Sequence, residues 1–111
     1  MDNRISDKDL EFVTGGAAAT PELAVVLNLL RRAEHLFTDD MPEVPRNIIS
    51  SAITSLNHGL DITLTLEHNI PTVIDEFNTF KDTLLPEDAD MRRIVDNIIH
   101  YLSSALNHLN H

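Results

Sequence analysis

The sequence predicts an all-α protein, an antiparallel helical bundle of about four helices preceded by a short leader helix. Apolar residues recur at three- and four-residue steps in four successive segments, which is the spacing of amphipathic helices. Short polar stretches containing proline or glycine separate these segments. At 111 residues, with 42% of them hydrophobic, the chain has the length and composition of one such bundle.

The first bundle helix has a clear start. Thr20 suits the N-cap, Pro21 the first helical position, and Glu22 the positive end of the helix dipole. Its apolar stripe consists of Leu23, Val26, Leu27, Leu30, Ala33 and Phe37. Residues 38–45 are polar and proline-bearing, which indicates a loop after this helix.

The second helix runs from Pro45, and its stripe consists of Ile49, Ala52, Ile53 and Leu56. Gly59 is a candidate C-cap. Residues 60–66 alternate like a strand, but no second strand pattern exists to pair with them, and an isolated strand is not stable. We therefore expect these residues to be helical, with Leu60, Leu64 and Glu67 continuing the stripe of the second helix.

The third and fourth helices follow a predicted break or kink at residues 69–71, where Pro71 interrupts the pattern. The third stripe consists of Val73, Phe77, Phe80 and Leu84. Residues 86–88, Pro-Glu-Asp, are expected to open the last helix with negative charge at its positive end. The last stripe is the clearest and consists of Met91, Ile94, Val95, Ile98, Leu102, Ala105 and Leu109.

Charge and composition exclude several classes of function. Eight Lys and Arg against 18 Asp and Glu give a net charge of −10, which argues against nucleic-acid binding and against attraction to anionic lipids. The absence of Cys excludes disulfides, thiolate zinc sites and Cys nucleophiles. No apolar run approaches the ~18 residues of a membrane span.

We expect neither an enzyme nor a cofactor. The sequence has no phosphate-binding glycine loop, no Gly-x-Ser-x-Gly elbow and no Glu-x-x-His pair of the kind that holds iron in bundles. His108 and His111 are three residues apart, and His100 precedes them on the same helix. Because His111 is the final residue, where a helix frays, we favour exposed polar histidines over a metal site.

Residues 1–16 have an organisation of their own. Ser6 can cap a short helix with Asp9 three residues later, and Gly15 and Gly16 stop it. Its apolar residues Ile5, Leu10, Phe12 and Val13 fall on one broad face. A helix this short is not stable alone, but it can fold against the groove of a partner.

This segment resembles the double-glycine leader of class II bacteriocin and microcin precursors. The resemblance covers residues 1–16 and rests on the spacing of Ile5, Ser6, Asp9, Leu10, Val13, Gly15 and Gly16. It implies that the peptidase domain of an ABC exporter recognises the first five of these residues and cuts after Gly16. Two residues without side chains fit an extended path through a narrow protease cleft. The alternative is an ordinary N-terminal helix ended by a glycine cap.

The resemblance predicts a secreted, bacteriocin-like small protein whose leader is residues 1–16 and whose helical bundle is residues 17–111. The precursor would be cytoplasmic. The released part carries six Lys and Arg against 14 Asp and Glu, a net charge of −8, so we expect binding to an unknown protein target and no direct membrane insertion. Surplus apolar residues beside the stripes leave surface for a homodimer or a partner. The alternative is an intracellular helical-bundle interaction protein, such as a bacteriocin immunity protein.

Overall fold

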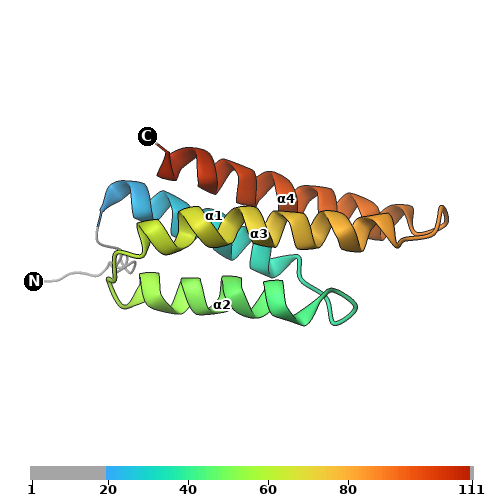
Figure 1. The fold of residues 1–111 in the computed structure, drawn as a ribbon, viewed down its shortest axis with the longest axis horizontal. Coiled ribbons are helices and arrows are strands. Elements are labelled where there is room, and N and C mark those ends of the chain that lie inside the picture. The colour runs from blue at the N-terminus through green and yellow to red at the C-terminus, as the bar shows by residue number, and fades with distance from the viewer. Residues whose placement is uncertain (1–19, 111) are drawn as a thin grey trace, which may run out of the picture.

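The computed structural model describes residues 20–110 and confirms the all-α bundle. The helices are α1 (Pro21–His35), α2 (Glu43–Asn57), α3 (Thr63–Asp82) and α4 (Ala89–Leu109), and this part of the chain contains no strand. They alternate in direction, so that α1 packs between α2 and α4, and α3 completes the bundle beside α4 and α2 (Figure 1). The start of α1, the α2–α3 loop and the end of α4 consequently share one end of the bundle.

The predicted start of α1 is confirmed. The side-chain oxygen of Thr20 accepts a hydrogen bond from the backbone N–H of Leu23 at 3.1 Å, and Pro21 occupies the first turn. This bond satisfies one of the N–H groups that have no partner within the helix. The predicted stripe faces the core, with Leu23, Val26, Leu27, Leu30 and Ala33 buried.

α2 begins at Glu43, two residues before the predicted start. Pro45 is accommodated because it lies in the first turn, where its missing N–H would have no helical partner. The predicted stripe is buried, and the helix ends at Asn57. Gly59 then adopts a φ of 77°, in the left-handed region that glycine enters without steric cost, so the chain turns sharply before α3.

The predictions for residues 60–71 are partly wrong. Residues 63–66 are helical, but they open α3 and do not continue the face of α2. Leu60 and Leu64 are 53% and 82% exposed, whereas Leu66 is buried. The turn at Gly59 resets the helical face, so the stripe of α3 runs through Leu66 and Ile70.

The sequence predicts a break or a kink at residues 69–71, and the break is wrong, because α3 continues through Pro71. Proline in a helix interior removes one backbone hydrogen bond and costs ~3 kcal/mol or more. Ile70 and Val73, on either side of Pro71, are completely buried. Burial of two such side chains is worth roughly 3–6 kcal/mol, which offsets the cost of keeping Pro71 inside a continuous helix.

The core lies along the axis of the bundle and draws on all four helices. Its largest member is Phe77 of α3, whose ring centroid lies 5.5 Å from that of Phe37, just beyond α1. The predicted stripe of α4 is confirmed at its centre, where Val95, Ile98, Leu102 and Ala105 are buried. α4 begins at Ala89, so residues 86–88 form the turn before it and not its first turn.

Candidate protein-binding groove

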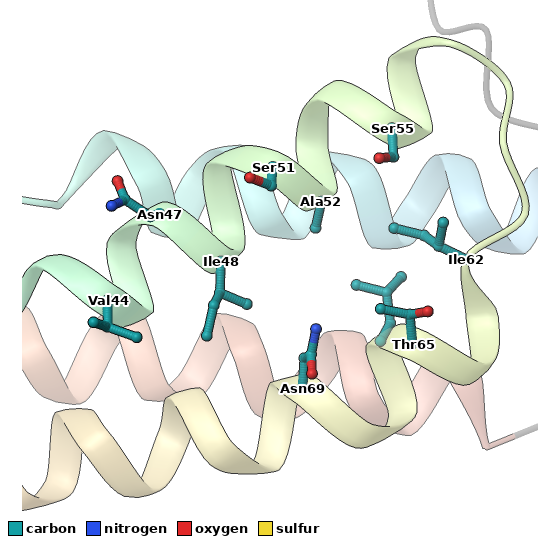
Figure 2. A pocket seen from close by; sticks show the side chains of 10 residues that line it. Val44, Asn47, Ile48, Ser51, Ala52, Ser55, Ile62, Thr65 and Asn69 are labelled. Carbon is teal, nitrogen blue, oxygen red and sulfur yellow. The ribbon is translucent and has the colours of Figure 1, made fainter.

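An open groove separates α2 from α3 on one side of the bundle (Figure 2). It has a volume of about 370 Å³, and residues of α2, the α2–α3 loop and the first half of α3 line it. The lining residues are Val44, Asn47, Ile48, Ser51, Ala52, Ser55, Ile62, Thr65, Leu66 and Asn69. In the close view, Ile48 and Ala52 point from α2 toward α3, and Asn69 points back toward α2.

The groove exists because short side chains line the seam between the two helices. On α2 they are Ser51, Ala52 and Ser55, and on α3 the short side chain is that of Thr65. Side chains of this size leave a gap between two helices unless the helix axes approach each other closely. The α2–α3 pairing is accordingly the least extensive of the four neighbouring helix pairs.

Polar contacts join α1 to α2 and α3 to α4. Glu34 of α1 accepts a hydrogen bond at 2.8 Å from the hydroxyl of Ser50 of α2, and Arg31 of α1 donates to the side-chain oxygen of Asn57. Lys81 of α3 forms an ion pair at 2.8 Å with Asp96 of α4. Within residues 20–110, no side-chain hydrogen bond or ion pair joins α2 to α3. The α2–α3 side is therefore the side on which the bundle is least closed.

The chemistry of the groove suits binding. Its floor is apolar and consists of Ile48, Ala52, Ile62 and Leu66, and its rim carries the hydroxyls and amides of Asn47, Ser51, Ser55, Thr65 and Asn69. Val44 lines the groove at the start of α2, away from the α2–α3 loop, and is 66% exposed. None of the lining residues is charged, although charged residues make up 23% of the chain. An apolar floor with a neutral hydrogen-bonding rim fits the apolar face of a helix or peptide.

A hydrogen-bonded turn lies at the end of the groove that is next to the α2–α3 loop. The carboxylate of Asp61 accepts hydrogen bonds from the hydroxyl and the backbone N–H of Thr63, at 2.6 and 3.0 Å. The hydroxyl bond is the larger cause, and together the two bonds lower the pKa of Asp61 below its ordinary value. This turn sets the start of α3 and the position of Ile62 in the groove.

The residues that the sequence assigns to leader recognition and cleavage lie outside the described part of the chain. They are Ile5, Ser6, Asp9, Leu10, Val13, Gly15 and Gly16, and their roles stay predictions. His100 and His108 are both exposed on α4, and His111 is outside the described residues. No group of three or more candidate metal ligands occurs between residues 20 and 110. None of the four described helices is both long and apolar enough to cross a membrane.

Sequence reasoning missed the groove, although the sequence carries a signal for it. Residues 47–57 contain no charged residue and no histidine, and neither do residues 62–66. In a chain with a net charge of −10, two neutral stretches that flank one short loop indicate a shared uncharged surface. The depth of the groove depends on the spacing of α2 and α3, which the sequence pattern does not give.

Comparison with known proteins returns no match to a family model, a curated protein or a solved structure.

Proposed function

We propose that this chain is the precursor of a secreted, bacteriocin-like small protein. A peptidase-containing ABC exporter cuts it after Gly16 during export, and residues 17–111 then act by binding a protein. The proposal for export is supported by the spacing of the apolar, acidic and glycine residues in the first 16 positions.

The observation that carries the binding role is the uncharged groove between α2 and α3. Elsewhere the bundle is strongly acidic, with a net charge of −8 over residues 17–111. A partner that approaches the groove meets no charged side chain in its lining, and desolvating a neutral rim costs less than desolvating charged groups. The apolar floor supplies the favourable free energy of association.

A protein target is favoured over a lipid target. Six Lys and Arg are outnumbered by 14 Asp and Glu in residues 17–111, which opposes approach to anionic headgroups. The most apolar residues of the helices face the core of the bundle and are not free to enter a bilayer.

The experiment is processing of the full chain in a strain that carries a peptidase-containing exporter. Replacing Gly15 or Gly16 with Val introduces a branched side chain at the cleft, so we expect uncut precursor to be retained. Ala19→Val is the matched control, because it places the same valine side chain three residues beyond the cut and leaves the glycines intact. Normal cleavage of both glycine variants would contradict the proposal.

The second candidate is an intracellular interaction protein, such as a bacteriocin immunity protein, and the compact four-helix bundle favours it. In that case residues 1–16 are a structural part of the chain. The intact mass of the protein in culture medium and in cell lysate separates the two candidates. Full-length protein confined to the lysate, in the presence of the exporter, supports the second.

A further inference from the structure

The groove between α2 and α3 is an apolar surface that the bundle itself leaves open. The same chain contains a short amphipathic segment outside the bundle, with its apolar residues Ile5, Leu10, Phe12 and Val13 on one face. We propose that residues 5–14 dock as a helix into the α2–α3 groove of their own chain and cover it until the leader is removed.

The lengths of the two elements match. The groove runs along α2 from Val44 to Ser55, three helical turns or about 17 Å. A helix over residues 5–14 is about 15 Å long. The apolar face of the segment therefore spans the floor formed by Ile48, Ala52 and Leu66 with little overhang.

The segment enters from the correct end. α1 begins at the end of the bundle that also holds the α2–α3 loop, where Ser55 and Ile62 line the groove (Figures 1 and 2). Residues 15–19, Gly-Gly-Ala-Ala-Ala, span roughly 17 Å when extended. Neighbouring helix axes lie ~8–10 Å apart, so this length crosses the end of α2 from α1 to the groove. Residues 5–14 then run parallel to α2, with Leu10 near Ser51.

The charges favour this face over the others. Residues 1–16 carry four acids against Arg4 and Lys8, and the rest of the chain carries a net charge of −8. An acidic segment is repelled by the acidic faces of the bundle, whereas the groove lining contains no charged residue. The amides of Asn47 and Asn69 on its rim can donate hydrogen bonds to carboxylates of the segment.

Docking in this manner gives the leader a second role. The role rests on the proposed cleavage after Gly16, because removal of the leader uncovers the groove for its protein target. Before export, the binding surface is occupied by its own chain. The docking itself does not depend on any exporter.

Disulfide trapping in the purified full chain tests the docking. Because the chain has no native cysteine, only the two introduced cysteines can form a disulfide. Leu10→Cys is paired either with Ser51→Cys on the rim or with Asn28→Cys on the exposed face of α1. Asn28 lies seven residues from Pro21 and Ser51 six residues from Asn57, so both are about 10 Å from the same end of the bundle. We expect the 10–51 disulfide to form within one chain at least about tenfold faster than the 10–28 disulfide.

Three outcomes overturn the proposal: equal rates for the two pairs, no disulfide at all, or a 10–51 disulfide that links two chains. The third assigns the groove to a second copy of the protein.

A charge test separates docking from a change of fold. Thr65 is exposed on the α3 rim, so Thr65→Asp places a negative charge beside the acidic segment and should slow the 10–51 disulfide several-fold. Thr65→Asn introduces a side chain of the same shape as Asp but without its charge, and it should leave the rate of the 10–51 disulfide unchanged. Equal disulfide rates for the two variants would contradict docking of residues 5–14 in the groove. The assay contains no exporter, so its result is independent of whether cleavage occurs after Gly16.

Discussion

Two leucines of the same helical turn should differ sharply in their contribution to stability. Leu66 is 1% exposed and lies between the core and the groove, whereas Leu64 is 82% exposed. Leu66→Ala removes three buried carbon atoms, worth ~2.4 kcal/mol at ~0.8 kcal/mol for each. Measured buried Leu→Ala changes span ~2.7–5.0 kcal/mol, because a residual cavity adds to the loss. The space left by Leu66 opens into the groove, so we expect about 3 kcal/mol, near the lower limit.

The assay is urea unfolding followed by circular dichroism, since the chain has no Trp. Leu64→Ala is the matched control and should change the free energy of unfolding by no more than about 0.5 kcal/mol. A domain of this size has a total stability of roughly 5–14 kcal/mol, so the loss at Leu66 is easily measured. Equal effects, or a larger effect at Leu64, would refute the register of α3 and with it the geometry of the groove.

Three further predictions concern the ends of helices and the surface. Thr20→Ala removes the cap of α1 and should cost about 1 kcal/mol in urea unfolding, whereas Thr20→Ser should retain most of the stability. The hydrogen bonds from Thr63 lower the pKa of Asp61 below its ordinary value, so their stabilisation is present above that ordinary pKa and is lost as the pH falls through the lowered one. Asp61→Asn should therefore weaken the fall in stability on acidification, and an unchanged fall would assign it to other carboxylates. Residues 17–111 should not release dye from anionic vesicles at about pH 7, and strong leakage there would indicate a membrane target.

The sequence predicts best where local signals and packing agree. Thr20 and Pro21 mark the start of α1 through groups that act within one turn, and the stripe around Ile98 places α4 without further information. These features depend on residues three or four positions apart, which a sequence pattern displays directly.

The sequence predicts poorly where the outcome depends on tertiary structure. The choice between Leu64 and Leu66 as the buried residue follows from the turn at Gly59, which resets the helical face of the next segment. Pro71 reads as a break, yet the burial of Ile70 and Val73 keeps α3 continuous. The groove is a gap between two helices, and its neutral lining becomes recognisable as one surface only when α2 and α3 are placed side by side.

The most direct test of the proposed function is the N-terminal residue of the exported protein. The full chain is expressed with a peptidase-containing ABC exporter, and protein from the culture medium is examined by N-terminal sequencing and intact mass. The account predicts a chain that begins at Ala17 and ends at His111, with residues 1–16 removed. Protein in the medium that still begins at Met1, or a chain retained whole in the cell despite an active exporter, would contradict it.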